Sequence, residues 1–282
     1  MEIDYKVRDV MVGDVISVTV PGTRDNVLKI FKDKQVSGVP AIKENGDLVG
    51  IVTRFDLLQH SEEEQIALLM TRDPVTIDPN ANLADAVKLI NEHNIRRLPV
   101  INNGDLEGIV TVADIIKIIS TLDSEKTIER CICKGVVSIW DETPLPVVGK
   151  IMELAIVAAA PLVNSAQELS GIITDRDLIN RAIIEDYVEK SDMSAGSDED
   201  AWTWESMRDT MKMYYGVSKI SLPNTPVKDI MVTDLITEFY GAEMRECAKL
   251  MVKHNIDQIP IVSPDQKLVG LLTDKDLLKC II

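Results

Sequence analysis

Apolar and polar positions along the chain follow two different spacings. Between residues 83 and 90 the apolar residues recur every three or four positions, which predicts an amphipathic helix carrying Leu83, Ala86, Val87, Leu89 and Ile90. A continuous apolar run follows at 98–101, then a polar turn at 102–105 and a second apolar run. Asn-Gly and Gly-Asp pairs between apolar runs are typical of β-hairpins. This stretch therefore predicts one helix followed by two hairpin strands.

The same pattern occurs four times, and three short marks recur with it. Each copy ends in Gly-x-x-Thr-x-x-Asp, whose last two marked residues are Thr53 and Asp56, Thr111 and Asp114, Thr174 and Asp177, and Thr273 and Asp276. An apolar residue and a proline lie 12 or 13 positions before each Thr, as Val39-Pro40, Leu98-Pro99, Ala160-Pro161 and Ile259-Pro260. A hydroxyl residue lies 23 positions before each proline, as Ser17, Thr76, Ser138 and Thr237. Such internal repetition indicates one structural unit used four times.

Each unit is predicted to contain a short strand with the hydroxyl residue, a helix, two hairpin strands and a final helix. The order β-α-β-β-α places the chain in the α/β (α+β) class. The prolines of copies one and two are 59 residues apart, and those of copies three and four are 99 apart. We therefore expect two tandem modules, with an insertion in the second. The expected boundaries are 1–60, 64–122, 123–186 and 226–282 for the copies and 187–225 for the insertion.

The insertion at 187–225 reads as an acidic linker with a helix. It begins with an acidic stretch that contains Ser and Gly. A helix is then predicted over Ala201–Tyr215, with the apolar residues Trp202, Trp204, Met207, Met211 and Tyr214. Because aromatic side chains bury large areas, we expect this helix to dock against the body of the protein. A lid over a site and a surface for a partner are the alternatives.

The composition of the chain disfavours several classes of binding partner. Asp and Glu number 46 against 30 Lys and Arg, a formal charge of −16, which disfavours nucleic acids and anionic membranes. No apolar run is long enough to span a bilayer, and the first residues lack signal-peptide features, so a cytoplasmic location is expected. Cys131 and Cys133 have no second pair at zinc-site spacing. We therefore expect no metal, and we expect these thiols to stay reduced.

The Thr-x-x-Asp turn has two interpretations. It resembles a capping box, in which the Thr caps a helix and an acidic residue lies in the first turn. A capping box normally uses Glu or Gln at the acidic position, however, and all four copies have Asp. A short carboxylate at a helix start can accept two hydrogen bonds from a ribose diol. Free N–H groups of the same helix start can meet an anion.

The three marks in four copies resemble the cystathionine-β-synthase (CBS) domain family, and the pairs of copies are similar to Bateman modules. Four-copy chains of this kind include archaeal proteins and the γ subunit of AMP-activated protein kinase. The resemblance implies that copies pair through their sheets and that the clefts bind AMP, ADP, ATP or S-adenosylmethionine. It implies that the four turn aspartates bind ribose, together with the four threonines and Arg54. The hydroxyl residues and the apolar–Pro pairs would lie beside the adenine.

Phosphate binding distinguishes the copies. In the family, basic residues before the proline strand often meet phosphate. Copy two has Arg96-Arg97 at this place, whereas the others have Ser37-Gly38, Ala158-Ala159 and Asp257-Gln258. We therefore expect copy two to hold a phosphorylated adenine nucleotide. The other copies would be empty or would hold a less anionic ligand such as S-adenosylmethionine.

The predicted function is that of a non-catalytic sensor, in which an adenosyl ligand sets the orientation of paired copies for an effector protein. The three histidines, His60, His93 and His254, show no Ser, Cys or Asp constellation for catalysis. A structural or assembly module with empty clefts is one alternative. An enzyme regulatory subunit that acts mainly through partner contacts is another. A homodimer through the modules is also possible, and neither nucleic acid nor membrane is expected as a partner.

Overall fold

A computed structural model describes residues 5–122, 126–133, 135–193 and 211–280. The predicted β-α-β-β-α order is confirmed in copies one, three and four. In copy two, a single bridge from Ile77 to Val100 replaces the first strand. The elements of copy one are β1 (Val18–Thr19), α1 (Arg24–Lys34), β2 (Gly38–Ile42), β3 (Leu48–Thr53) and α2 (Arg54–Gln59). Those of copy two are α4 (Leu83–Glu92), β5 (Arg97–Asn102), β6 (Asp105–Thr111) and α5 (Val112–Thr121).

The second half of the chain repeats this order. Copy three contains β7 (Ile139–Trp140), α6 (Leu145–Ala155), β8 (Ala159–Val163), β9 (Leu169–Thr174) and α7 (Asp175–Arg181). Copy four contains β12 (Glu238–Phe239), α8 (Met244–His254), β13 (Gln258–Val262), β14 (Leu268–Thr273) and α9 (Asp274–Lys279). In each copy the two long strands pair antiparallel, and the short first strand or bridge pairs parallel to the proline strand.

Within each module, the segment that leads into one copy pairs with the hairpin of the other. Val12 bridges to Ile109 of copy two, and β4 (Thr71–Arg72), after the short helix α3 (Ile66–Leu69), pairs with β3 of copy one. The second module repeats the exchange, with Cys133 bridged to Leu271 and Ile172 to Val232. The exchange explains why one copy alone is not a complete unit.

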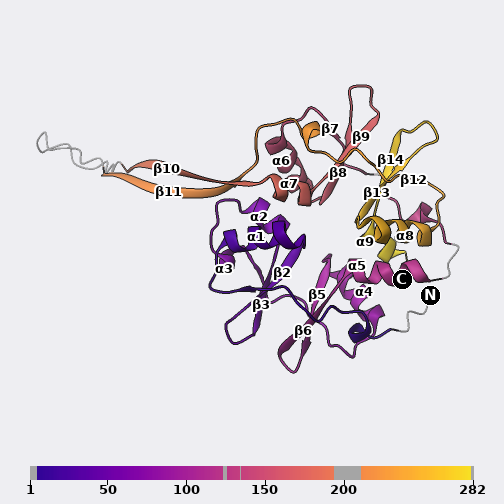
Figure 1. Cartoon of the computed structure of the whole chain (residues 1–282), viewed down its shortest axis with the longest axis horizontal. Coiled ribbons are helices and arrows are strands. Elements are labelled where there is room, and N and C mark those ends of the chain that lie inside the picture. The colour runs from indigo at the N-terminus through magenta and orange to yellow at the C-terminus, as the bar shows by residue number, and fades with distance from the viewer. Residues whose placement is uncertain (1–4, 123–125, 134, 194–210, 281–282) are drawn as a thin grey trace, which may run out of the picture.

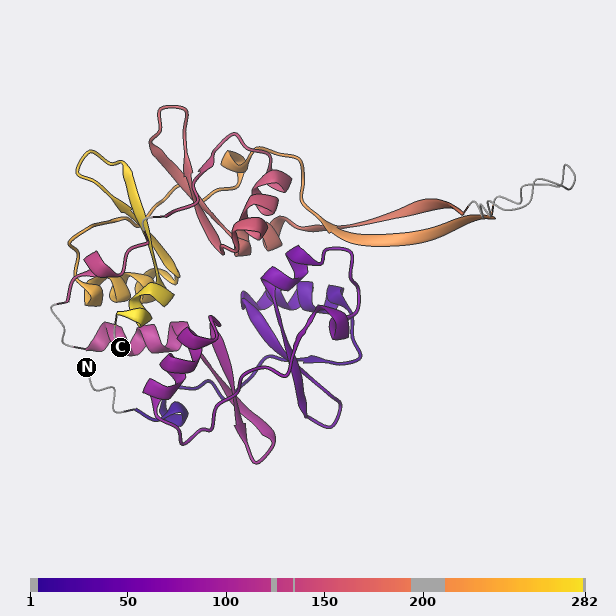
Figure 2. The same ribbon diagram turned by 180° about the vertical axis from the view of Figure 1, so that it is seen from behind.

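The two modules join through helices. Copy one faces copy three through α1 and α2 against α6 and α7, and copy two faces copy four through α4 and α5 against α8 and α9. Ile179 and Ala182 of copy three lie in the buried core of copy one, and the cores of copies two and four are continuous. Figure 1 and its reverse view in Figure 2 show the four copies arranged around one centre. The two modules therefore form a single disc within one chain.

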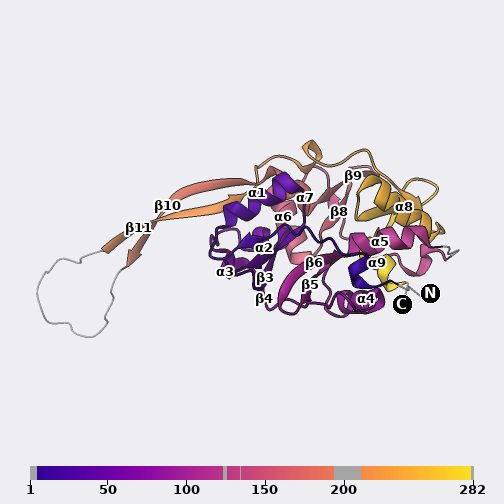
Figure 3. The same ribbon diagram turned by 60° about the horizontal axis from the view of Figure 1, so that its bottom comes forward.

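The insertion forms an antiparallel arm, and the helix predicted over Ala201–Tyr215 is wrong for residues 211–215. β10 (Ile183–Met193) pairs with β11 (Met211–Ser221) from Ile183–Ser221 out to Met193–Met211. Residues 201–210, with Trp202 and Trp204, lie outside the described residues. The arm points away from the disc in two directions of view (Figure 1, Figure 3). Its strands are rich in Tyr, Val and Ile, and a continuous ladder of partner hydrogen bonds outweighs the helical spacing of the apolar residues.

The base of the arm is fastened to copy one. The Arg24 guanidinium is 1% exposed and donates to the carbonyl oxygens of Ser61 and Ser218 at 2.7 and 3.1 Å. It also donates to the Ser218 hydroxyl at 2.9 Å, and the Ile220 N–H donates to the Ser61 carbonyl at 2.8 Å. These contacts hold the start of the arm against copy one.

The expectation of reduced thiols is wrong for Cys131, which forms a disulfide with Cys280. The two residues are 149 positions apart, with Cα atoms 6.0 Å apart. The segment that leads into copy three pairs with the hairpin of copy four, and this pairing brings Cys131 beside the end of α9. Cys133 and Cys247 are free. None of the helices in the described part of the chain has the length and apolar character that a bilayer crossing needs.

Candidate functional site

All four Thr-x-x-Asp turns are helix caps. In copy one, Oδ2 of Asp56 accepts hydrogen bonds from the Thr53 N–H and hydroxyl, both at 2.7 Å. The Asp56 N–H donates to Thr53 Oγ1 at 3.3 Å, and the other three copies repeat this arrangement. The helix α4 has the same box with Asn82 and Asp85. Because α4 also uses Asp, the choice of Asp over Glu does not by itself indicate a ligand.

The four turns differ in whether the second carboxylate oxygen of the aspartate, Oδ1, has a hydrogen-bond donor. In copies two and four a lysine three positions later donates to Oδ1, Lys117 to Asp114 at 2.8 Å and Lys279 to Asp276 at 3.1 Å. Copies one and three have Gln59 and Asn180 at that position. No residue in the described part of the chain donates to Oδ1 of Asp56 or Asp177. These two oxygens are therefore available to a ligand.

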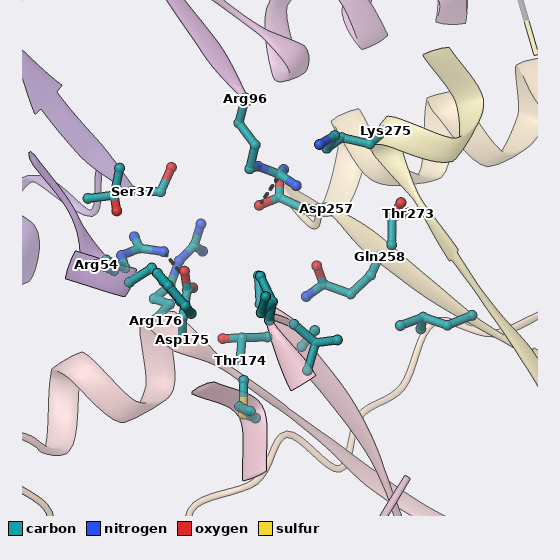
Figure 4. A pocket seen from close by; sticks show the side chains of 18 of the residues that line it. Ser37, Arg54, Arg96, Thr174, Asp175, Arg176, Asp257, Gln258, Thr273 and Lys275 are labelled. Carbon is teal, nitrogen blue, oxygen red and sulfur yellow. Dashed lines mark hydrogen bonds and ion pairs between the residues drawn. The ribbon is translucent and has the colours of Figure 1, made fainter. Parts of the chain in front are cut away.

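A cavity of about 880 Å³ lies where the four copies meet. It is lined by turn residues of copies one, three and four: Thr53, Thr174, Asp177, Thr273 and Asp276. Copy two contributes Arg96 and Arg97, whereas its Thr111 and Asp114 are absent from the described lining. Figure 4 shows polar side chains from different copies pointing toward this space.

The side chain of Arg96 contacts an acidic pair in copy four. Its Nη2 lies 3.3 Å from Oδ2 of Asp257 and in hydrogen-bond contact with Oδ2 of Asp274 (Figure 4 shows Asp257). Burial alone would lower the pKa of Arg96, but the two carboxylates outweigh it and raise that pKa. Asp274 is 2% exposed. Burial is the largest influence on the pKa of the Asp274 carboxyl and raises it. The charge of Arg96 opposes this rise and the charge of Asp257 adds to it, and the resulting pKa is about 6.

Arg97 crosses from copy two into copy one. Its side chain is buried, and Nη2 donates to the Ser37 hydroxyl at 2.7 Å. Its Nη1 has no hydrogen-bond partner within the described residues. Burial, and then the charge of Arg96, lower the pKa of Arg97 to about 10. This guanidinium thus lines the cavity with one donor atom unused.

Arg54 is placed in a similar way. It is 2% exposed, and its Nη1 donates to Oδ1 of Asp175 in copy three at 3.1 Å. Nη2 donates to the Gln35 carbonyl at 3.1 Å, while Nε has no partner within the described residues. Burial is the largest influence on its pKa and lowers it, and the carboxylate of Asp175 opposes that shift. A buried cation with unused donors is costly unless an anion or water completes it.

One wall of the cavity is apolar. Ala159, Ile172 and Leu271 form a buried cluster with Val136 and Leu235, and all five line the cavity. These residues come from both copies of the second module. A flat apolar group could lie against this wall while its polar end reaches the arginines.

The strand residues predicted beside adenine lie elsewhere in most cases. Val39, Leu98, Ala160 and Ile259 have no exposed surface. Pro260 lines the cavity, but Pro40, Pro99, Pro161 and the four hydroxyl residues Ser17, Thr76, Ser138 and Thr237 are not among its described lining. The positions just before three of the hydroxyl residues do line it, as Val75, Val137 and Ile236.

Two acidic residues at the site were not singled out from the sequence. Asp175 lines the cavity and Asp274 contacts Arg96, and each occupies the position directly after the turn threonine, where copy one has Arg54. Comparing this position across the four copies would have shown that its charge changes sign. That comparison could have identified them as candidates.

Comparisons with known proteins agree with this architecture. The chain is 26% identical to the uncharacterized protein MJ1225 of Methanocaldococcus jannaschii over 195 residues, which is 63% of this chain and 70% of that one. It is 33% identical to MJ1232 of the same organism over 120 residues, 42% of this chain and 40% of that protein.

Two solved structures cover the chain from end to end. The crystal structure of MJ1225, proposed as an archaeal homologue of γ-AMPK, aligns with a TM-score of 0.78 at 21% identity, covering 99% of this chain and all of that one. An uncharacterized conserved protein from Pyrococcus horikoshii aligns with a TM-score of 0.65 at 26% identity, with the same coverage. The CBS domain matches at residues 7–63, 64–121, 128–183 and 227–282. The chain therefore belongs to the CBS domain family, with four domains in two pairs.

Proposed function

We propose that this chain is a non-catalytic regulatory sensor that binds an adenosyl ligand with an anionic tail in the central cavity. The observation that carries the proposal is the buried Arg97 guanidinium, which lines the cavity and whose Nη1 has no hydrogen-bond partner among the described residues. A guanidinium group binds phosphate in a charge-assisted, often bidentate manner. Arg54, whose Nε has no hydrogen-bond partner among the described residues, lines the same space.

The rest of the ligand is inferred from the other walls. A volume of about 880 Å³ is within the range of small-molecule sites. The free Oδ1 of Asp177 suits a ribose diol, and the apolar cluster around Ile172 suits a base. Asp175 and Arg176 connect these features, because they lie between Thr174 and Asp177 and Asp175 contacts Arg54. AMP, ADP and ATP fit a cationic centre better than S-adenosylmethionine, which stays as the alternative ligand.

The proposed phosphate site differs from the expected one in a single respect. Arg97 is still proposed to bind phosphate, as expected for copy two. Arg96 is already occupied by Asp257 and Asp274. The phosphate would therefore contact Arg97 and Arg54, at the meeting point of copies one, two and three.

The regulatory action follows from the position of the cavity. All four copies contribute to its walls, so a ligand that binds one arrangement of the modules better than another shifts the population toward that arrangement. An effector protein would read the shift. We propose no chemical step, because guanidinium and ammonium groups hold an oxyanion and do not exchange protons readily at neutral pH.

Titration calorimetry of the full chain with AMP, ADP, ATP and S-adenosylmethionine tests this function. We expect binding of at least one of the nucleotides, weakened about tenfold or more in Arg97→Gln, because a charge-assisted hydrogen bond in a buried site is lost. Arg72→Gln is the matched control, since Arg72 is exposed and, among the described residues, its guanidinium group donates only to the Ala67 carbonyl. No heat with any of the four compounds would refute the proposal.

An assembly module with empty clefts is the second candidate. The ion pairs Arg54–Asp175 and Arg96–Asp257 favour it, because they join the two modules without a ligand. Native mass spectrometry of the purified chain separates the candidates. A copurifying adenosyl mass supports the sensor, and a ligand-free chain that also binds nothing in the titration supports the assembly module.

A further inference from the structure

The first helical residue after each turn threonine differs in charge between the modules. It is Arg54 in copy one and Val112 in copy two, but Asp175 in copy three and Asp274 in copy four. Arg54 faces Asp175 across the module boundary, and Asp274 faces Arg96 across the same boundary. The first module thus supplies the cations and the second module supplies the carboxylates.

The contact at Arg96 is the stronger candidate for a functional role. Two carboxylates, from Asp257 before β13 and Asp274 at the start of α9, meet one guanidinium group. Figure 4 shows Arg96 reaching toward Asp257 beside Lys275 and Gln258. Arg96 lines the cavity and its side chain is 29% exposed, so an anion in the cavity can reach it.

Carboxylate and phosphate oxygens are the same kind of partner for a guanidinium group. Nη2 of Arg96 already meets two carboxylates, so a phosphate that leaves them in place finds only the Nη1 and Nε donors of this group. The carboxylates also add negative charge beside it, which repels an anion at short range. An anion that takes the Nη2 donors of Arg96 therefore displaces one or both aspartates.

We propose that Asp257 and Asp274 act as an internal competitor that occupies Arg96 in place of an anionic ligand. An anion that takes Nη2 of Arg96 must displace these carboxylates and so weaken the contact between copies two and four. This competition rests on the proposed function only because it takes place in the same cavity. It gives Asp257 and Asp274 a role in setting how much negative charge a ligand of the cavity can carry.

Displacement of these aspartates from Arg96 would act directly on the interface between the two modules. Asp274 is the first residue of α9, and α9 packs against α4 and α5 of copy two. Asp274 is also 2% exposed, so its carboxylate cannot turn to bulk solvent without movement of the helix start. A change of partner at Arg96 therefore connects the ligand to the copy two–copy four interface.

The test is calorimetric titration of the full chain with inorganic pyrophosphate and with AMP, at pH 7.5. We expect Asp257→Asn to bind pyrophosphate about tenfold more tightly than the unaltered chain, because the competitor at Arg96 is weakened. Asp234→Asn is the control. Asp234 also lines the cavity and its substitution removes the same charge, but no arginine contacts it in the described part of the chain. We expect less than a twofold change there.

Asp257→Asn is preferred to Asp274→Asn because the side chain of Asp257 is 38% exposed, so the substitution is compatible with folding. Equal effects of Asp257→Asn and Asp234→Asn would overturn the competitor, since general charge would then explain both. Weaker binding in Asp257→Asn, or no pyrophosphate binding by any variant, would also overturn it.

The two proposals fail separately. If the unaltered chain binds AMP and Asp257→Asn binds both probes no more tightly than Asp234→Asn, the sensor stands and the competitor fails. If no adenosyl compound binds but pyrophosphate binds more tightly to Asp257→Asn, the competitor stands and the adenosyl function fails.

Discussion

The Arg97 guanidinium lies directly against the backbone of Gly38. A Cβ built on Gly38 would be 1.2 Å from Nη1 and 2.5 Å from Cζ of Arg97, with the Val52 carbonyl oxygen 3.1 Å away. No side chain fits at this place while Arg97 keeps its position. The absence of a side chain in copy one therefore permits the buried cation that copy two supplies.

Gly38→Ala should expel Arg97 from its position. The contact is with the end of a long side chain, so we expect the fold to persist at a cost of about 1–3 kcal/mol from overpacking. Nucleotide binding should weaken about tenfold or more, as in Arg97→Gln. Calorimetry and thermal unfolding measure the two effects.

Gly13→Ala is the control for this substitution, because its nearest neighbour is the Glu107 carbonyl oxygen at 3.8 Å. It should change neither quantity. Undiminished nucleotide binding in Gly38→Ala would show that the position of Arg97 does not matter to the ligand.

Asn180→Lys should place a lysine on the unoccupied Oδ1 of Asp177 in the turn of copy three. Lysines three positions after the aspartate occupy Oδ1 in copies two and four. The same residue at exposed position 180 should therefore occupy Oδ1 of Asp177 and weaken adenosyl binding about tenfold. Asn180→Gln keeps the position neutral and should bind like the unaltered chain. If the lysine variant binds as well as the glutamine variant, Asp177 does not hold the ribose.

Asp274 should make the stability of the fold depend on pH. The groups around its carboxyl are Arg96, Asp257 and Lys275, and burial raises its pKa from 3.8 to about 6. Because the pKa is higher in the folded chain than in the unfolded chain, this contribution to stability is fully present below about pH 4. It is lost as the pH rises through about 6.

Thermal unfolding between pH 4.5 and 7.5 checks this dependence. The unfolding temperature of the unaltered chain should fall relative to Asp274→Asn as the pH rises. Parallel pH profiles of the two proteins would contradict the assignment of this shift to Asp274.

The four cysteines should differ in reactivity. Cys133 is exposed, whereas Cys131 and Cys280 are joined and Cys247 is buried, with burial raising the pKa of its thiol to about 12. Alkylation at pH 8 without reductant should therefore label Cys133 alone, since the thiolate is the reactive form. Mass spectrometry counts the labels, and Cys133→Ser should take none. Two labels on the folded, unreduced chain would contradict this order.

The repeat, its four helix caps and the hairpins were all predictable because they depend on neighbours in the chain. Thr53 and Asp56 are three residues apart, and their mutual hydrogen bonds form wherever a helix starts there. Two of the predictions that failed involve distant partners. Residues 211–215 pair with residues 189–193, and Cys131 meets Cys280 only after the leads of copies three and four exchange.

The site shows the same division. Sequence alone determined the four β-α-β-β-α units, the unequal residues before each proline, and Arg96 and Arg97 as a distinct pair. The positions of those arginines depend on the packing of the four copies, because their partners come from other copies: Ser37 for Arg97, and Asp257 and Asp274 for Arg96. Local hydrogen bonds follow from spacing along the chain, whereas the charges that meet at the centre of the disc depend on how four separate units pack.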